Sequence, residues 1–412
     1  MRMVIKDAVR EAGNDPIFAV AQRASQAIAE YGADNVVDST LGALFDDEGN
    51  LICFDEVYTV LKNLPDAQIA GYAGIPGIPA FRTQVQEACF RDHRPDAFIE
   101  AVATPGGTGA IRNAVANYTN YGDKILLPDW HWAPYQTIAA ENRRGFAFFE
   151  LYDENGDFNM QSYKSVFSEL LDKQGRILSI LNTPAHNPTG YSISIPEWKE
   201  LIDFYTTTAK ADPENRIIIL VDIAYIDFAG EGSRDFMELL AGMPENVLVL
   251  YAFSASKGYT MYGLRNGAIL CAAPNQETAD EFAASCTFSN RGTWSNGTRC
   301  AMETLAKINE DTDSLERFLA EQAKYRVLLQ KRADAFLGEA ERVGLNLCSY
   351  RDGFFISIPC DDPKAAAAML EDQNIFIVAL KKGLRFAPCA VAEADCLKVP
   401  ALIKKAVDAV NK

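Results

Sequence analysis

The amino-acid sequence predicts an α/β protein in which a large domain with a mainly parallel sheet is joined to a smaller α+β domain. Short apolar, β-rich runs alternate with amphipathic helical segments over residues 84–300, and this alternation is typical of parallel sheets. Several runs are apolar along their whole length, as expected for strands buried on both faces. Beyond about Cys300 the pattern changes to a long charged helix over residues 309–344. A length of 412 residues is enough for two or three domains.

The predicted elements follow one another in order along the chain. In the large domain, segments 110–121 and 196–209 are expected to be helices, and strands are expected at residues 98–102, 124–128, 146–151, 176–181, 216–221, 247–253 and 267–272. The smaller domain is expected to combine a helix over residues 16–31, short strands at 354–359 and 375–378, and a last helix from about Val399. We place the large domain at residues 51–299 and the smaller domain at residues 1–50 and 300–412.

Composition excludes several classes of protein. The net charge of −17 and the pI near 4.7 disfavour partners such as nucleic acid and anionic membranes. The nine cysteines form no CxxC pair, and their odd number indicates reduced thiols in a cytoplasm. The N-terminal segment lacks the apolar core of a signal peptide, and no apolar run is long enough to span a membrane. The three histidines lack zinc-ligand spacing. We therefore expect a cytoplasmic protein with no metal site, nucleic-acid partner or membrane segment.

The most informative stretch is residues 253–267, FSASKGYTMYGLRNG. It places Lys257 between small hydroxyl residues and Arg265 eight positions later. A lysine can form a Schiff base with an aldehyde, and an arginine can hold a phosphate in a two-pronged grip. The alternative is a lysine on an exposed loop, which the Ser-Ala-Ser-Lys pattern directly after a predicted strand disfavours.

Two further segments follow predicted strands. In ATPGGTGA at residues 103–110, small residues such as Gly107 let backbone N–H groups approach a phosphate at the positive end of a helix, and Thr108 can add a hydroxyl. A tight strand–helix turn explains these glycines equally well. In PDWHWAPY at residues 128–135, a tryptophan can stack on a flat heteroaromatic ring. We favour Trp130 over Trp132 for stacking, with a core aromatic cluster as the alternative.

These motifs, in this order and at this spacing, resemble those of the pyridoxal-phosphate enzymes of fold type I, in particular the class I and II aminotransferases. The likeness runs from about Pro16 to the end of the chain. It implies the cofactor pyridoxal 5'-phosphate, carried as a Schiff base on Lys257, which also moves the substrate proton. It further implies the phosphate ligands Gly107, Thr108, Ser254, Ser256 and Arg265.

The resemblance also assigns polar groups around the cofactor ring. Asp222 ends a predicted apolar strand, where a buried carboxylate is costly unless it is paired. In the family its partner is the pyridine nitrogen, whereas the alternative reading is a helix N-cap. Asn187, in the NPTG motif, and Tyr225 are expected to hydrogen-bond the phenolic oxygen. Asn187 and Trp130 are also expected beside the substrate.

Four more residues complete the resemblance. Tyr72 matches the tyrosine that reaches across a dimer interface to the phosphate of the other subunit. Arg385 matches the arginine that clamps the substrate α-carboxylate, and Gly42 lies in the turn that closes over it. Arg291 matches the arginine with which aspartate aminotransferases bind the side-chain carboxylate across the interface, although a structural ion pair is an alternative role.

One departure concerns the support of the buried aspartate. Aspartate aminotransferases follow the stacking tryptophan with an asparagine and then a histidine that supports the aspartate. Counted from Trp130, these positions hold Trp132 and Ala133. We therefore expect Asp222 to be supported by different groups.

The sequence thus predicts a homodimeric aminotransferase. It is expected to move an amino group from an L-amino acid, with aspartate and glutamate favoured, to a 2-oxo acid such as 2-oxoglutarate. The alternatives are an aromatic amino acid aminotransferase, suggested by the extra tryptophan, and a β-lyase or decarboxylase that uses the same cofactor on the same scaffold. A non-catalytic ligand-binding module, like the aminotransferase-like half of some transcription regulators, is disfavoured by the acidic charge.

Overall fold

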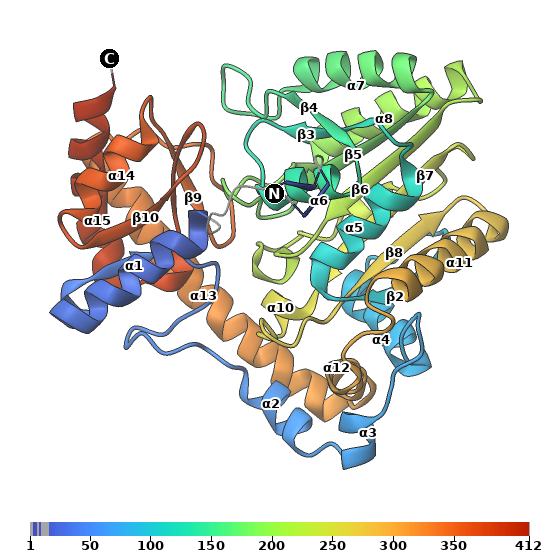
Figure 1. Cartoon of the computed structure of the whole chain (residues 1–412), viewed down its shortest axis with the longest axis horizontal. Coiled ribbons are helices and arrows are strands. Elements are labelled where there is room, and N and C mark those ends of the chain that lie inside the picture. The colour runs from blue at the N-terminus through green and yellow to red at the C-terminus, as the bar shows by residue number, and fades with distance from the viewer. Residues whose placement is uncertain (1–2, 6–7, 10–15, 412) are drawn as a thin grey trace.

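The computed structural model describes residues 3–5, 8–9 and 16–411. It has two lobes, one around a seven-stranded sheet and one around a four-stranded sheet (Figure 1). The order in the large sheet is β2-β8-β7-β6-β5-β3-β4, and only β8 runs antiparallel to its neighbours. The strands are β2 (Phe98–Thr104), β3 (Lys124–Pro128), β4 (Gly145–Phe149), β5 (Arg176–Asn182), β6 (Arg216–Asp222), β7 (Val247–Ser254) and β8 (Gly267–Ala273). The predicted α/β class with a mainly parallel sheet is confirmed.

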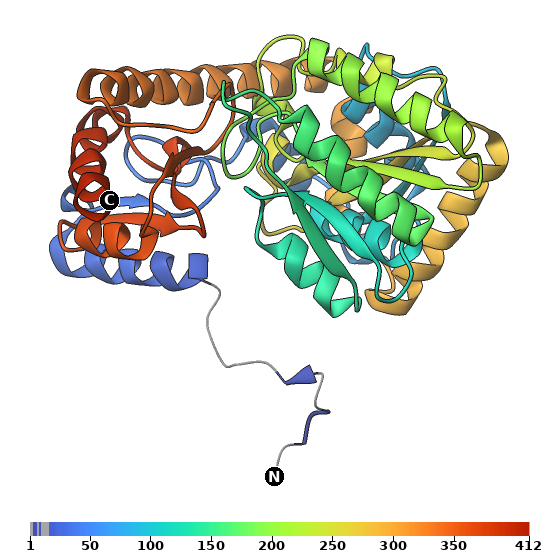
Figure 2. The same ribbon diagram turned by 90° about the horizontal axis from the view of Figure 1, so that it is seen from above.

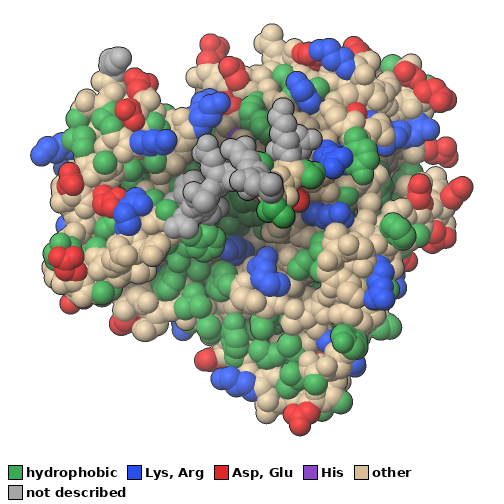
Figure 3. All heavy atoms as spheres, in the orientation of Figure 1, with side chains coloured by type: hydrophobic (Ala, Val, Ile, Leu, Met, Phe, Trp, Pro, Cys, Tyr) green, Lys and Arg blue, Asp and Glu red, His purple; other side chains and the backbone are tan. Residues whose placement is uncertain are grey.

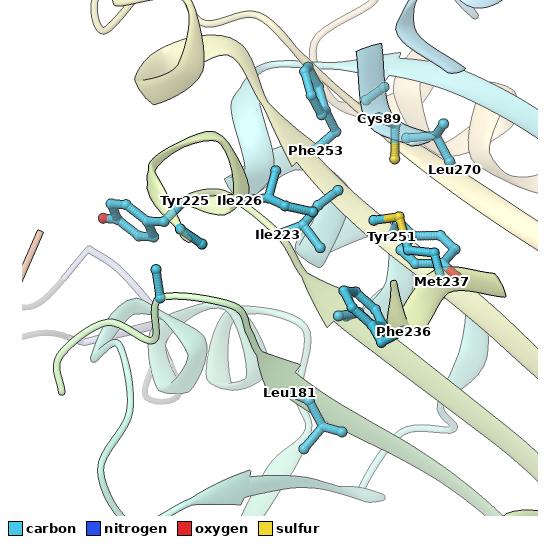
Figure 4. Packing of buried hydrophobic residues seen from close by; sticks show 14 of the residues in the cluster. Cys89, Leu181, Ile223, Tyr225, Ile226, Phe236, Met237, Tyr251, Phe253 and Leu270 are labelled. Atoms are coloured by element: carbon cyan, nitrogen blue, oxygen red, sulfur yellow. The ribbon is translucent and has the colours of Figure 1, made fainter. Parts of the chain in front are cut away.

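Both faces of the large sheet are covered by helices, because in its central strands both sets of alternate residues are apolar. In β6, Ile217, Ile219 and Val221 belong to one core cluster, whereas Ile218 and Leu220 belong to another. The second cluster packs under α5 (Gly106–Tyr118), α6 (Pro134–Glu141) and α11 (Gln276–Thr293). The first packs under helices that include α4 (Pro79–Phe90), α7 (Met160–Gln174), α8 (Ile195–Ala211) and α9 (Phe236–Leu239). Figure 4 shows part of this first cluster, where Tyr251 lies close to Met237 and Phe236 of α9.

The small lobe holds the sheet β1-β10-β11-β9. Its strands are β1 (Val37–Ser39), β9 (Ile356–Pro359), β10 (Ile375–Ala379) and β11 (Gly383–Phe386). The helices around it are α1 (Pro16–Tyr31), α14 (Pro363–Glu371), α15 (Glu393–Val410) and the end of α13 (Thr312–Val343). The prediction that the last helix starts at about Val399 is wrong, because α15 begins at Glu393 and contains Pro400. Proline removes one helical hydrogen bond, but buried Cys396, Val399 and Ile403 hold this helix against the small lobe.

Helix α13 joins the lobes. It spans 32 residues and runs from the large lobe to the far side of the small one (Figure 2). At its first end, Arg317 pairs with Glu56 at 2.8 Å, next to α2 (Asp55–Lys62), α3 (Asp66–Ala70) and α12 (Arg299–Glu310). Further along it, buried Arg332 donates to the carbonyl of Phe45 at 2.9 Å. The domain boundaries at residues 50/51 and 299/300 stay predictions. Across residues 3–5, 8–9 and 16–411, no helix is long and apolar enough to cross a membrane.

Candidate active site

A cavity of about 550 Å³ opens where the carboxyl ends of β6 and β7 face the small lobe. Ligands of open α/β sheets bind at such strand ends. In Figure 3 the face of the molecule is hollowed near its centre, between the two lobes. The cavity brings together most residues of the predicted site, namely Gly42, Gly107, Thr108, Asn187, Asp222, Tyr225, Ser254, Ser256, Lys257, Arg265 and Arg385.

Lys257 lies in the single turn α10 (Ala255–Gly258), which directly follows β7. Its Nζ donates a hydrogen bond to the carbonyl of Gly42 at 2.6 Å and lies 4.9 Å from the ring centre of Tyr262. Desolvation lowers the pKa of Lys257 to about 8, and the positive charges of Arg265 and Arg385 act in the same direction. A lysine with a lowered pKa presents the neutral, nucleophilic amine more readily near neutral pH.

Asp222 ends β6 and is buried. Its Oδ2 accepts a hydrogen bond from the hydroxyl of Tyr135 at 2.6 Å, and its Oδ1 accepts one from the backbone N–H of Ala224 at 3.1 Å. Burial raises the pKa of Asp222 to about 6, and these two hydrogen bonds oppose that rise. A carboxylate in this setting is a partner for a cationic group inside the cavity.

An anion site lies beside the start of α5. The guanidinium of Arg265 donates to the hydroxyl of Ser256 at 3.1 Å and to the carbonyl of Tyr262 at 2.9 Å. The close approach needs a glycine, because a Cβ on Gly106 would come within 2.6 Å of Arg265 Nη2. Hydroxyls, a guanidinium and the N-terminus of a thirteen-residue helix form a donor set for a phosphate.

A second arginine reaches the cavity from the small lobe. Arg385, in β11, donates to the carbonyl of Thr40 at 2.7 Å and to Asn187 Oδ1 at 3.4 Å. Its guanidinium also stacks 4.3 Å from the ring centre of Phe355. Asn187 Nδ2 in turn donates to the hydroxyl of Tyr225 at 3.3 Å. These contacts connect the guanidinium of Arg385, which can bind a carboxylate, to the amide of Asn187 and the phenol of Tyr225 within the same cavity.

Trp130 and Trp132 differ in their position relative to the cavity. The side chain of Trp130 does not line the cavity; Trp132 does. Asp129 Oδ1 accepts hydrogen bonds from the backbone N–H groups of Trp130 at 2.9 Å and Leu151 at 3.0 Å, which connects the start of the turn to the segment that follows β4. The indole of Trp130 then packs against Gly383 of the small lobe, and Trp132 is the tryptophan that lines the cavity.

Tyr72 and Arg291 lie outside the cavity of their own chain. Tyr72 follows α3 and is 89% exposed. Arg291 lies in the last turn of α11, is exposed, and donates to the hydroxyl of Ser295 at 2.8 Å. Their expected tasks across a dimer interface stay predictions.

Several site residues were missed from the sequence. Tyr135 supports Asp222, Tyr262 lies under Lys257, and Phe355 lies under Arg385. For Tyr135 a signal existed. It follows Trp132 by three residues, the spacing at which aspartate aminotransferases carry their supporting histidine after the stacking tryptophan. For Tyr262 and Phe355 we find no local signal beyond their aromatic character.

Comparison with known proteins places these residues in a family. A family model described as aminotransferase class I and II matches residues 40–399. A tyrosine aminotransferase of Rhizobium meliloti is 25% identical over 86% of this chain and 89% of its own length. An aspartate aminotransferase of Escherichia coli is 26% identical over 69% of this chain and 70% of its own.

Solved structures agree on the fold. An aminotransferase from Anaerococcus prevotii matches all of both chains with a TM-score of 0.96 and 38% identity. An aromatic-amino-acid aminotransferase from Burkholderia pseudomallei, covalently bound to pyridoxal phosphate, has a TM-score of 0.79 at 19% identity and covers 98% of this chain and 100% of its own.

The donor set of the cavity fits pyridoxal 5'-phosphate. An amine on Lys257 suits its aldehyde, the Asp222 carboxylate suits its pyridine nitrogen, and the Arg265 site suits its phosphate. Across residues 3–5, 8–9 and 16–411, no group of three or more His, Cys, Asp or Glu side chains converges as metal ligands would. With a family match over most of its length and a cavity that suits this cofactor, the chain belongs to the class I and II aminotransferases, which use pyridoxal 5'-phosphate.

Proposed function

We propose that this aminotransferase takes the amino group of an L-amino acid and gives it to a 2-oxo acid such as 2-oxoglutarate, with Lys257 as the residue that binds the cofactor and moves the substrate proton. The observation that carries the proposal is the convergence of Lys257, Asp222 and Arg385 on one cavity. An amine, an opposed carboxylate and a carboxylate-binding arginine are the three groups that this chemistry needs.

When bound, pyridoxal 5'-phosphate supplies an aldehyde that condenses with amines and a ring that withdraws electrons from the reacting carbon. Asp222 would hold the pyridine nitrogen, and Asn187 and Tyr225 would hold the phenolic oxygen. Gly107, Thr108, Ser254, Ser256 and Arg265 would hold the phosphate. Trp132, rather than Trp130, provides the stacking face, because only Trp132 lines the cavity.

The substrate is oriented from the small lobe. Arg385 holds the α-carboxylate in a bidentate grip, while its own contacts to Thr40 and Phe355 fix the guanidinium. The neutral amine of Lys257 would accept the α-proton of the substrate and later give it back. The turn at Gly42, whose carbonyl already touches Lys257 Nζ, covers the site and excludes water.

Two substrate classes have support. Aspartate and glutamate are favoured by Arg291, provided that it reaches the cavity of a second subunit. Aromatic amino acids are favoured by the cavity walls within one chain, because Trp132 and Tyr262 line the cavity. The basic residues that line the cavity in the described part of the chain are Lys257, Arg265 and Arg385. All three have other tasks, so a side-chain carboxylate depends on a group from another chain.

A homodimer with shared active sites follows from the same reasoning. Tyr72 is highly exposed and Arg291 is exposed, as residues that act in a partner's cavity are in a single chain. On the face drawn in Figure 3, hydrophobic side chains gather over α2 and α12. Exposed apolar side chains beside these two residues, such as Ile69 and Phe288, suit a protein–protein interface.

Product analysis tests the reaction. The purified protein is incubated with single L-amino acids and 2-oxoglutarate, and we expect glutamate and a new 2-oxo acid in equal amounts. Ammonia and pyruvate formed without consumption of 2-oxoglutarate would identify a β-lyase instead, and carbon dioxide would identify a decarboxylase.

Specificity is tested by the ratio of kcat/KM for aspartate to that for tyrosine. If Arg291 reads a side-chain carboxylate, Arg291→Gln lowers this ratio by about tenfold or more. Arg342→Gln is the matched control, because Arg342 is a surface arginine that pairs with Glu339 in the small lobe. A wild-type enzyme that prefers tyrosine, with a ratio unchanged by Arg291→Gln, selects the aromatic assignment.

A further inference from the structure

Tyr135 is the buried neighbour of Asp222 on the side away from the cavity. It is 1% exposed, lies in the first turn of α6, and does not line the cavity. Its hydroxyl donates to Asp222 Oδ2 at 2.6 Å, while Asp222 Oδ1 receives the N–H of Ala224. A carboxylate can accept about four hydrogen bonds. Asp222 therefore keeps acceptor capacity for a donor inside the cavity.

The start of α6 fixes this arrangement. Pro134 occupies the first turn, where its missing N–H costs nothing and its fixed φ suits a helix. The ring of Trp132 meets that of Tyr135 edge-on, with centroids 5.4 Å apart and planes at 87°. One short segment thus provides both the aromatic wall of the cavity and, behind it, the hydroxyl that holds the carboxylate.

We infer that Tyr135 is a positioning residue for Asp222: its hydroxyl keeps this carboxylate charged and aimed into the cavity, and thereby extends activity to more acidic solution. The inference rests on the proposed function, in which Asp222 pairs with the cofactor ring. A donor that stabilises the charged form of a buried carboxyl group opposes the effect of desolvation. Without it, Asp222 takes up a proton nearer to neutral pH and can no longer act as an anion.

Other charges that face Asp222 do not replace this hydroxyl. Tyr225, in the turn after β6, carries a phenol whose pKa is raised by burial and therefore stays neutral. Lys257, Arg265 and Arg385 line the same cavity. Each donates a hydrogen bond to another residue: Lys257 to Gly42, Arg265 to Ser256 and Arg385 to Thr40. The donors to the carboxylate within the described chain are therefore Tyr135 and the N–H of Ala224.

A phenol differs from an imidazole in this place. Burial and the adjacent Asp222 carboxylate raise the pKa of Tyr135 well above its ordinary value. Its hydroxyl remains a donor over the whole working range, whereas a histidine would change its own charge between pH 5 and 8. Tyr135 therefore adds no titration of its own to the acid limb of the rate profile between pH 5 and 8.

The test compares the Tyr135→Phe holoenzyme with Tyr163→Phe. Tyr163 is a similarly buried tyrosine whose hydroxyl forms hydrogen bonds with Ser179 at 2.9 Å and Tyr205 at 2.7 Å rather than with Asp222. We expect Tyr135→Phe to move the acid limb of kcat upward by at least about one pH unit and to weaken cofactor binding about tenfold or more. We expect Tyr163→Phe to leave both unchanged. Tyr135→His should restore the wild-type limb in part.

Cofactor binding is read from the visible absorbance of apoprotein titrated with pyridoxal phosphate, which needs no turnover. If the wild type transaminates none of the amino acids, the proposed function fails while this titration still tests Tyr135. The inference is overturned if Tyr135→Phe binds pyridoxal phosphate with wild-type affinity and the acid limb of its kcat profile is not shifted. If Tyr135→Phe does not fold, Tyr135→His is compared with the double variant Tyr135→His/Asp222→Asn. The inference is also overturned if Tyr135→His changes cofactor affinity by the same factor whether residue 222 is Asp or Asn.

Discussion

The indole of Trp130 in the large lobe lies against Gly383 of the small lobe, so close that a Cβ on Gly383 would come within 2.9 Å of Trp130 Cη2. The neighbouring residues, Asp129 and Lys382, form an ion pair across the same junction. Gly383 begins β11, which carries Arg385. These two contacts therefore fix the position of β11 relative to the large lobe, and with it the position of Arg385 in the cavity.

We expect Gly383→Ala to disturb this junction. The added methyl group would meet the Ile358 carbonyl as well as Trp130, so β11 has to move. Overpacking of this kind costs about 1–3 kcal/mol of the free energy of unfolding. Because Arg385 moves with the strand, KM for the amino acid should rise, as measured by steady-state kinetics alongside thermal unfolding.

Gly338→Ala is the matched control for that variant. Gly338 lies within α13 with open space around its Cα, so a methyl group meets nothing. Replacement of a helical glycine by alanine is expected to stabilise the protein by about 0.5–1 kcal/mol. If both variants lower the melting temperature equally, the argument from the Trp130 contact is wrong.

Arg385→Ala should damage substrate binding far more than cofactor binding. Loss of a bidentate pair with the α-carboxylate is expected to raise KM about a hundredfold. The dissociation constant of pyridoxal phosphate should change only about threefold or less, since Arg385 approaches the groups around the cofactor through its hydrogen bond to Asn187. Arg385→Lys keeps the positive charge but cannot bind a carboxylate in a bidentate way, so its KM should lie between those of the wild type and Arg385→Ala. Equal losses in both constants would remove Arg385 from its proposed role.

The pH dependence of cofactor uptake follows from Lys257. Its pKa is lowered to about 8 by desolvation, and only the neutral amine attacks an aldehyde. In stopped-flow absorbance, the rate at which apoprotein takes up pyridoxal phosphate should rise about tenfold per pH unit below pH 8 and level off above it. Lys257→Ala should develop no such signal. A rate that is flat from about pH 6.5 to 9 would contradict the lowered pKa.

The same shift predicts a change in the stability of the apoprotein. Because the pKa of Lys257 is lower in the folded chain, the unfolded chain binds the proton more tightly between pH 8 and the ordinary lysine value of 10.5. The free energy of unfolding should therefore rise through that window relative to Lys257→Met. Chemical denaturation of both proteins at several pH values measures this difference.

Hybrid dimers test whether Arg291 acts across an interface. Lys257→Ala and Arg291→Ala proteins are each expected to be poor aspartate aminotransferases. In a hybrid, the intact Lys257 of one subunit faces the intact Arg291 of the other, so one of two sites is complete. Random reassociation should restore about a quarter of the wild-type activity with aspartate. No recovery after verified exchange would mean that Arg291 serves its own chain or has no part in binding.

Local sequence patterns predicted the sheet and most of the site. The strands could be predicted from the apolar runs, because a strand buried on both faces is apolar along its length. Lys257 and Arg265 could be predicted because they lie at a characteristic spacing within one segment. The sequence favoured Trp130 over Trp132 as the stacking residue, but their positions depend on a hydrogen bond that the backbone N–H of Leu151, just beyond β4, donates to Asp129. The partner of Tyr135 lies 87 residues away. Contacts between residues so far apart in the sequence produce no local sequence pattern from which they could be predicted.

The pairing of β1 with β10 sets the order in which the enzyme can be completed during translation. Val37 lies opposite Ile375, more than 300 residues later in the chain. The ribosome therefore releases the first strand of the small sheet long before its neighbour exists, while the segment that carries Lys257 can already join the large sheet. Arg385 emerges after both. A nascent chain can thus build the cofactor side of the cavity early, but it acquires the substrate side only near the end of synthesis, which delays catalysis until both lobes are formed.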